Sequence, residues 1–511
     1  MSIAKETPSL VILGIDAGDF RFIKHWAQEG YLPTMASIMK RGCWGRTTGT
    51  DLNIEHGVWV SLFSGIPRKH HGYYYFRQLV PGTYELQTTT GLDINAPRFW
   101  EYLRSKSQKV AIIDVPDTYP VNELKGIQLC DWAVHNPSAA PASSSPALLS
   151  EVRRVFGRQM NIDEKLRSTW PEDVKIFRHL LQRIEKKGAL CRHLLSQDHF
   201  AVIVAVFGES HTGGHQFWKY RPESHHQAQA GKENELTHAI RDIYQAIDRQ
   251  FGLLLEQIPE NANIVIVSSV GLQDQFPTTG LIESFCRKLG YQASPKSNGL
   301  PLRPLDLARK LMPEDWRIAL SRHLSRQKRE RLLADQFRNN TSWRNTTAFS
   351  IPSAYASYVR VNLRGREPLG VIESGFEYEE LLKRLEDDLW QLVDPDTGEK
   401  IVERVESRIE VYGNDASDTL PDLFVYWKPS TRFLRRVAHP RVELEQDEPE
   451  FFRDSDHSRY GFVAAVGPSI SRRGEIGDVP VLDLAPTFLT LMGEPVPPTM
   501  TGRVIVDSIH H

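Results

Sequence analysis

The chain has 511 residues, of which 40% are hydrophobic and 25% are charged, and its formal net charge is −2. This composition is typical of a soluble globular protein, and the near-neutral charge gives no general footprint for nucleic acid. The apolar runs are too short for a signal sequence or a membrane span, and the cysteines lack C-x-x-C spacing. We therefore expect a cytoplasmic protein with no nucleic-acid and no membrane partner.

Short apolar segments rich in β-branched residues recur along the chain and predict strands that are buried on both faces. They cover residues 10–16, 109–116, 200–207, 263–269 and 460–468. Helical patterns lie between them, and one keeps apolar residues at three- and four-residue spacing from Ile240 to Ile258. The alternation predicts an α/β fold, with a mostly parallel central sheet covered by helices on both faces.

Three regions depart from this alternation and predict insertions in a single domain that spans residues 1–511. Residues 136–197 begin with a loop rich in Pro, Ser and Ala and continue as helices. Residues 281–345 are helical and partly basic, which is typical of a solvated helix face. Residues 346–430 predict a small α/β subdomain.

Chemically competent side chains follow the predicted strands, where ligands of α/β proteins bind. Asp16 ends the first strand, Glu209, His211 and His215 follow the third, and His457 precedes the last. A pair of histidines four residues apart is weak evidence, since it also occurs as a hydrogen-bonded loop pair. The motif "DWAVH" repeats the same spacing between an aspartate and a histidine without a predicted role. The ordered set of strand-end residues is what favours a metal site.

Several blocks together resemble the alkaline phosphatase superfamily and, within it, the type I phosphodiesterase / nucleotide pyrophosphatase family. They read "VILGIDAGD", "GVWVSLFSGIPRKHHG", "SHTGGHQFW", "SSVG", "VNLRGREPLG" and "DSDHSRYGFVAAVGPSI". The resemblance covers nearly the whole chain and implies an alkaline-phosphatase-like fold. It also implies one metal site at His211, His215 and His457, with Asp16 as a further metal residue.

The same resemblance implies that parts of the usual site are replaced. Where the family has an adjacent Asp-His pair for a second metal, this chain has Ser269 and Val270. The family's hydroxyl nucleophile is expected four residues before Trp59, at a position held by Glu55 and followed by His56. A second metal and a side-chain hydroxyl nucleophile are therefore not expected, and His56 and Ser269 are predicted to contact substrate.

Three neutral imidazoles and an open position suit one Zn²⁺. Such an ion lowers the pKa of bound water to about 7, so water is the predicted nucleophile and Glu55 or Glu209 the predicted base. Asp16 either takes part in metal binding or orients a metal-bound histidine, and the less favoured alternative is a satisfied strand-end carboxylate. Glu55 and His56 could also be helix-start residues, where a carboxylate favours the helix dipole.

The predicted function is that of a metal-dependent hydrolase or transferase of the phosphodiesterase or phosphatase type, acting on a small anionic ester. One alternative is an inactive family member that binds a ligand or a partner. Another is a hydrolase of a non-phosphate ester or amide, because a zinc site with a water nucleophile also suits those bonds. The sequence does not predict the substrate or the oligomeric state.

Overall fold

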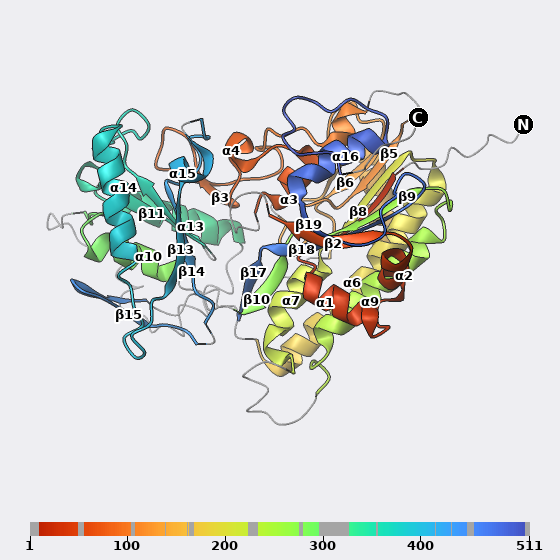
Figure 1. Cartoon of the computed structure of the whole chain (residues 1–511), viewed down its shortest axis with the longest axis horizontal. Coiled ribbons are helices and arrows are strands. Elements are labelled where there is room, and N and C mark those ends of the chain that lie inside the picture. The colour runs from red at the N-terminus through yellow and green to blue at the C-terminus, as the bar shows by residue number, and fades with distance from the viewer. Residues whose placement is uncertain are drawn as a thin grey trace, which may run out of the picture. The chain divides into compact units, whose positions relative to one another are not determined.

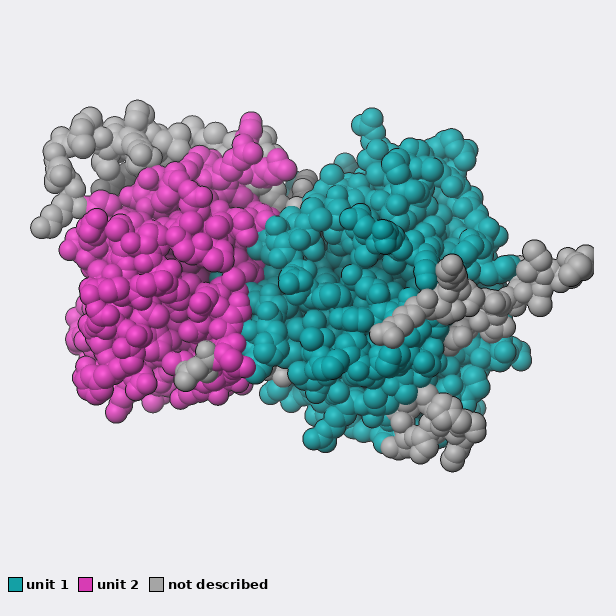
Figure 2. Space-filling view, turned by 90° about the horizontal axis from the view of Figure 1, so that it is seen from above, with its two compact units in different colours: residues 1–74, 89–274, 454–511 teal, residues 75–88, 275–453 magenta. Residues whose placement is uncertain are grey.

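The computed structural model describes most of the chain. The described residues are 10–49, 56–103, 108–137, 139–160, 162, 168–222, 234–274, 279–295, 326–353, 356–413, 415–430, 432–446 and 454–505. Within these ranges the chain forms two compact units: residues 1–74, 89–274 and 454–511 belong to unit 1, and residues 75–88 and 275–453 belong to unit 2 (Figure 2). No helix in the described ranges is both long and apolar enough to cross a membrane.

Unit 1 is built on a nine-stranded sheet with the strand order β19-β2-β18-β9-β1-β8-β5-β6-β7. The strands are β1 (Leu10–Ile15), β2 (Cys43–Thr48), β5 (Val110–Ile113), β6 (Gly126–Cys130), β7 (Ala142–Ser143), β8 (Val202–Phe207), β9 (Asn263–Val267), β18 (Tyr460–Val466) and β19 (Gly474–Pro480). Five of the eight neighbouring pairs are parallel, while β18 pairs antiparallel with both β2 and β9, and β7 with β6. The predicted α/β fold with a mostly parallel sheet is confirmed.

The register of the central strands brings their carboxyl ends to one edge. Ile15 lies opposite Phe207 in the pair of β1 with β8, and Gly14 lies opposite Val267 in the pair of β1 with β9. Every residue of β1, β8 and β9 is buried, which explains their continuous apolar sequences. The residues that follow these three strands therefore emerge side by side.

Helices cover both faces of this sheet (Figure 1). One group comprises α1 (Phe20–Gln28), α2 (Pro33–Arg41), α6 (Trp170–Gln197), α7 (Glu209–Phe217) and α9 (Ala239–Leu255). The other includes α3 (Val58–Ser64), α16 (Leu484–Leu491) and the 3₁₀ segments η1 (Phe99–Tyr102) and η4 (Val481–Asp483). The predicted helical segment 136–197 contains α5 (Pro146–Phe156) and α6.

Unit 2 has its own sheet and its own hydrophobic core. Four antiparallel strands stand in the order β11-β12-β14-β13, namely β11 (Ala348–Ile351), β12 (Ser357–Val361), β13 (Val402–Ser407) and β14 (Leu423–Trp427). The other elements include α10 (Thr279–Lys288), α13 (Arg326–Asn339) and α14 (Phe376–Leu389), with the hairpins β3 (Arg77–Leu79) with β4 (Leu86–Thr88) and β15 (Arg436–His439) with β16 (Val442–Glu445). The predicted segments 281–345 and 346–430 both fall in this unit, and their assignment as insertions of a single domain stays a prediction.

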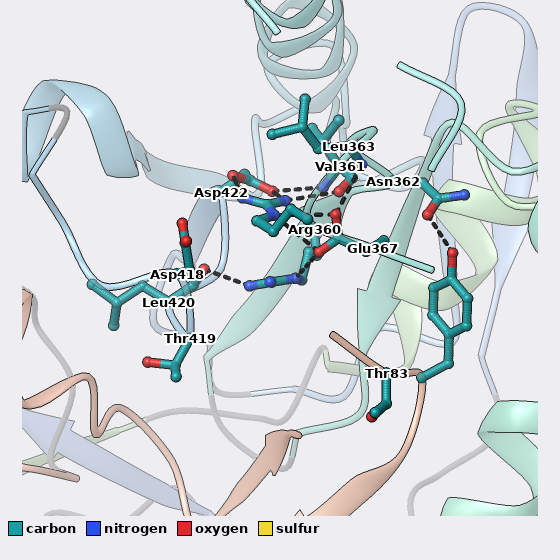
Figure 3. A network of polar contacts seen from close by, with 12 residues as sticks. Thr83, Arg360, Val361, Asn362, Leu363, Glu367, Asp418, Thr419, Leu420 and Asp422 are labelled. Carbon is teal, nitrogen blue, oxygen red and sulfur yellow. Dashed lines mark hydrogen bonds and ion pairs between the residues drawn. The ribbon is translucent and has the colours of Figure 1, made fainter. Parts of the chain in front are cut away.

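A buried polar network explains the motif "VNLRGREPLG" in unit 2 (Figure 3). Arg360 Nε donates to Glu367 Oε1 at 2.7 Å, and Arg366 Nη2 donates to Asp422 Oδ2 at 2.6 Å. The two carboxylates also accept backbone N–H groups, from Leu363 and Val361. Burial alone would raise the pKa of Asp422, but the arginines hold it well below its usual range. The network ties the loop after β12 to the start of β14.

Candidate metal centre

Helix α7 presents two histidines on one face, directly after β8. His211 and His215 stand four residues apart and are buried, so their side chains lie one above the other. The glycines between them allow the helix to approach its neighbours closely. A Cβ on Gly213 would lie 2.3 Å from Ile243 of α9, and one on Gly214 would lie 2.3 Å from Leu272. The sequence "HTGGH" is thus a close-packed helix turn.

The third histidine comes from a two-stranded ribbon beside α7, formed by β10 (Gly271–Asp274) and β17 (Ser455–Ser458) (Figure 1). His457 lies opposite Leu272 in this ribbon. Its ring centroid is 4.7 Å from that of His211 and 4.8 Å from that of His215. One nitrogen from each of the three rings lies within 4.8 Å of the others. Residues that are 246 positions apart in the sequence, His211 and His457, therefore meet in one cluster.

Each ring contacts a polar group through Nδ1. His211 Nδ1 lies 2.9 Å from Asp16 Oδ2, His215 Nδ1 lies 2.8 Å from Ser455 Oγ, and His457 Nδ1 lies 3.3 Å from Gly271 O. A carboxylate and a carbonyl can only accept, and a hydroxyl can accept. Protonation at Nδ1 leaves the lone pair on Nε2, which is the form that binds a metal ion.

The Nε2 atoms of two of the rings are as close as ligands of one small ion. His215 Nε2 lies 3.1 Å from His457 Nε2. Two nitrogens that each lie about 2.1 Å from a tetrahedral zinc are separated by about 3.4 Å. All three histidines are buried, so the donor set and its spacing suit a zinc ion.

Asp16 sits at the end of β1 and accepts hydrogen bonds on both carboxylate oxygens. Trp59 Nε1 donates to Oδ1 at 2.6 Å, and His211 Nδ1 donates to Oδ2. Ser269 Oγ also lies 3.4 Å from Oδ1, and the Asp16 backbone carbonyl accepts from Ser210 Oγ at 2.5 Å. Asp16 therefore adjoins the histidine cluster through His211, and the cluster of nitrogen ligands does not include it.

The remaining predicted site residues have different surroundings. Glu209 Oε1 accepts from Arg183 Nε at 2.7 Å, and both side chains are buried. The carbonyl of His56 accepts from Arg68 Nη2 at 2.9 Å, and the ring of His56 lies edge-on to Tyr73. Glu55 lies outside the described residues. Ser269 contacts Asp16, which in turn contacts His211 of the cluster. Its neighbour Val270 is buried.

A fourth histidine, the one in the motif "DWAVH" that has no predicted role, also lies at the cluster. His135 stacks on His211 with the ring centroids 3.6 Å apart and the planes inclined by 19°. Its Nδ1 lies 2.8 Å from Thr212 Oγ1 of α7, and its Nε2 lies 2.9 Å from Asn136 Nδ2. His135 follows β6, two strands away from β8 at the same edge of the sheet. Recognising residues 126–130 as a strand would have placed it beside the site.

No curated protein matches the sequence. Among solved structures, murine ectonucleotide pyrophosphatase / phosphodiesterase 5 is similar, with 12% identity over 96% of each chain and a TM-score of 0.48. Phosphonoacetate hydrolase from Sinorhizobium meliloti, solved with phosphonoformate, has 12% identity over 95% of each chain and a TM-score of 0.49.

The sequence also matches the family model described as type I phosphodiesterase / nucleotide pyrophosphatase, over residues 10–456. This match covers the strands of the central sheet up to the final antiparallel strand and all but one residue of the histidine cluster. The predicted resemblance is confirmed. The chain belongs to the type I phosphodiesterase / nucleotide pyrophosphatase family.

Proposed function

We propose that this protein is a metal-dependent phosphoester hydrolase with one zinc ion held by His211, His215 and His457. Membership of the family supports hydrolysis of phosphoesters in general. The observation that carries the proposal is the convergence of three buried imidazole nitrogens within 4.8 Å of one another. Three histidines with an open fourth position are one of the ligand sets of catalytic zinc sites. When bound, zinc supplies Lewis acidity to a substrate oxygen and acidifies a water molecule.

Asp16 acts in this proposal through His211 and not as a direct ligand. Its carboxylate fixes the Nδ1–H tautomer of His211 and strengthens Nε2 as a donor. The indole N–H of Trp59 holds the second carboxylate oxygen in place. The buried position of this aspartate prevents water from competing for the same hydrogen bonds.

The proton from the attacking water goes to a carboxylate base, and we assign that role to Glu55. The alternative base, Glu209, is engaged in a buried ion pair with Arg183. Breaking such a pair to move a proton would leave the guanidinium uncompensated. Glu55 directly precedes His56, which together with Ser269 is proposed to contact the substrate. The substrate in this proposal is a small anionic ester.

The residues at the second-metal position support one metal ion and not two. A two-metal site needs further ligands that hold a second ion about 3.5–4 Å from the first. Val270 offers no ligand atom, and Ser269 Oγ is directed to Asp16. The replacement of the second-metal ligands by Ser269 and Val270 also favours a second candidate function. In this alternative the protein is an inactive family member that binds an anionic ligand at the histidine cluster and does not hydrolyse it.

Metal analysis and an activity assay on the untagged protein separate these functions. The hydrolase proposal expects about one zinc per chain and release of nitrophenol from bis(p-nitrophenyl) phosphate. His215→Ala should remove both the zinc and the activity, because it removes a ligand. Zinc without turnover of phosphate, sulfate or carboxylate esters would favour the ligand-binding function. Turnover that persists in His215→Ala would refute the metal-dependent mechanism.

A further inference from the structure

A cavity in unit 1, lined by other residues than the histidine cluster, has a volume of about 230 Å³. Its walls come from residues 91–101 and from the segment that joins β5 to β6, and include Leu92, Ile94, Arg98, Trp100, Glu101 and Tyr119. None of the three clustered histidines lines it, and neither does Asp16. One water needs roughly 10–15 Å³ on this measure of volume, so the cavity can admit a small organic molecule.

The wall of this cavity contains a buried arginine whose guanidinium donates, within the described residues, to backbone carbonyls alone. Arg98 is 5% exposed. Its two terminal nitrogens donate to the carbonyls of Ala96 and Asp117, and Nε has no hydrogen-bond partner among the described residues. The nearby carboxylate of Glu101 accepts the backbone N–H of Arg98 at 2.6 Å. A buried charge is normally paired with an opposite charge.

The indole N–H of Trp100 is a second buried donor in this wall without an acceptor among the described residues. Trp100 is 2% exposed, and in the part of the chain that the structure describes its indole N–H reaches no acceptor. Buried N–H groups nearly always have an acceptor in native proteins. Burial also lowers the pKa of the Arg98 guanidinium, as expected when carboxylates compensate its charge only partly. The cavity wall thus brings together a cation and a neutral side chain, and among the described residues neither Arg98 Nε nor Trp100 Nε1 has an acceptor.

We propose that this cavity binds the oxyanion end of a small organic molecule, a carboxylate or a phosphate group, with Arg98 and Trp100 as its hydrogen-bond donors. One oxyanion offers several lone pairs, so it can accept from both side chains at once. The apolar walls at Leu92 and Ile94 suit an organic body attached to the anion. This site is independent of the histidine cluster and of the proposed hydrolase activity.

Titration calorimetry on the full-length His215→Ala variant tests the proposal, because this variant removes the metal centre as a competing anion site. Benzoate, inorganic phosphate and the neutral benzamide serve as probes. We expect one of the two anions, or both, to bind at one site per chain. Benzamide should bind at least tenfold more weakly, because it lacks one charge-assisted hydrogen bond, whose loss lowers the affinity about tenfold. Benzoate alone would identify a carboxylate ligand, and phosphate alone a phosphate ligand.

Two substitutions assign the binding to this cavity. Trp100→Phe keeps an aromatic ring against Phe63 and removes the donor, and it should weaken anion binding about tenfold. Trp132→Phe, a buried tryptophan in unit 1 outside the cavity lining, is its matched control and should leave binding unchanged. Leu92 is 65% exposed on the cavity wall, so Leu92→Asp should fold normally and repel the anion at low salt. Leu92→Asn is the neutral control.

Three results would overturn the proposal. The first is that neither anion releases or absorbs heat at millimolar concentration. The second is that benzamide binds as tightly as benzoate. The third is that folded Leu92→Asp and Trp100→Phe proteins, checked by circular dichroism, bind the anion as the parent does. Arg98→Met is a weaker test, because loss of its bonds to Ala96 and Asp117 also destabilises the wall.

Discussion

The three clustered imidazoles differ in the group that accepts their Nδ1 proton. His457 faces a backbone carbonyl and His215 a hydroxyl, while His211 faces the carboxylate of Asp16. A carboxylate partner increases the basicity of a histidine ligand most strongly. Asp16 is therefore the side chain outside the triad whose loss should weaken metal binding most.

Replacing Asp16 with Asn tests this role. The amide keeps the size of the side chain and loses the charge, so zinc affinity should fall by about 10- to 100-fold. Competition with a chelator of known affinity measures the change. Asp274→Asn is the matched control, because Asp274 also accepts an indole N–H, from Trp218 at 2.6 Å, but its carboxylate also accepts from Arg221 and not from an imidazole. Equal losses in both variants would contradict a specific role for Asp16.

The ion pair of Glu209 with Arg183 predicts a stability effect and not a loss of chemistry. Both side chains are buried, so Glu209→Leu should lower the free energy of unfolding by about 3 kcal/mol by leaving a buried guanidinium unpaired. The double variant Glu209→Leu, Arg183→Met should recover most of this loss in urea unfolding. Activity that returns with stability would show that Glu209 is structural. Activity that stays absent in a stable double variant would make Glu209 the base.

His71 predicts how stability depends on pH. Burial and the charges of Arg68 and Arg98 lower the pKa of His71 well below its usual value. The unfolded chain therefore binds a proton at this histidine near pH 6.5, whereas the folded chain does not. The contribution of neutral His71 to the free energy of unfolding is thus complete above about pH 6.5 and is lost as the pH falls below it. The slope reaches about 1.4 kcal/mol per pH unit.

Urea unfolding of His71→Asn across this range measures the effect. Asn can still accept the Tyr73 N–H that His71 Nδ1 accepts at 3.0 Å, and it does not titrate. The free energy of unfolding of the variant should fall less steeply below pH 6.5 than that of the parent. The difference in slope should correspond to the uptake of up to about one proton on unfolding. His70→Asn, at the exposed neighbour, is the control. Parallel slopes in the parent and His71→Asn would refute the assignment.

At the scale of elements, continuous apolar segments were predicted well and short or polar strands were missed. The five predicted strands correspond to β1, β5, β8, β9 and β18. The missed strand β6 reads "GIQLC" and is buried only in its second half, and the missed edge strand β19 reads "GEIGDVP" and is mostly exposed. Strands near a sheet edge need no continuous apolar run, so periodicity gave no signal for them.

This omission explains which parts of the site could be predicted. Asp16, His211 and His215 follow strands that the sequence reveals, and the structure brings them together with His457. Their role as metal ligands or ligand supports stays a prediction. His135 follows a strand that the sequence does not reveal, so its stacking on His211 could not be inferred. Ser455 and the carbonyl of Gly271 were also beyond reach, because their contacts depend on the register of the β10–β17 ribbon.

The close packing of α7 yields a prediction at this scale. A Cβ at Gly214 would lie 2.3 Å from Leu272 Cδ1, opposite His457 in the ribbon. Gly214→Ala gains up to about 1 kcal/mol of helix propensity but adds overpacking of about 1–3 kcal/mol, so net stability should fall. Zinc affinity should fall with it, because the helix is pushed away from His457.

Leu272→Val supplies the rescue for Gly214→Ala, because it removes the atom that the new Cβ would meet. The double variant should regain zinc affinity relative to Gly214→Ala alone, measured by the same chelator competition. Leu272→Val by itself should cost only about 1 kcal/mol of stability. If Gly214→Ala binds zinc as the parent does, the glycine is not needed for close packing at the metal centre.

At the scale of the whole molecule, the chemistry is concentrated in one of the two units. The histidine cluster, Asp16 and the cavity beside Arg98 all lie in unit 1. Unit 2 has a separate core and the buried network around Asp422. Its described elements contribute no member to the cluster of histidine nitrogens. The stability of unit 2 should therefore not depend directly on metal.

This separation predicts how zinc affects unfolding. A ligand that binds only the folded state stabilises it by about 2.7 kcal/mol at a hundredfold excess over its Kd. Because all three histidines belong to unit 1, zinc should raise the melting temperature of unit 1 in scanning calorimetry, and chelation should reverse the shift. The transition of unit 2, followed by hydrogen exchange of amides in β12 and β14, should move much less.

His215→Ala should abolish the zinc response and leave the exchange in β12 and β14 unchanged. Equal zinc-dependent protection in both units would show that they unfold as one, and two zinc ions per chain would show that ligands beyond the three histidines complete a second site.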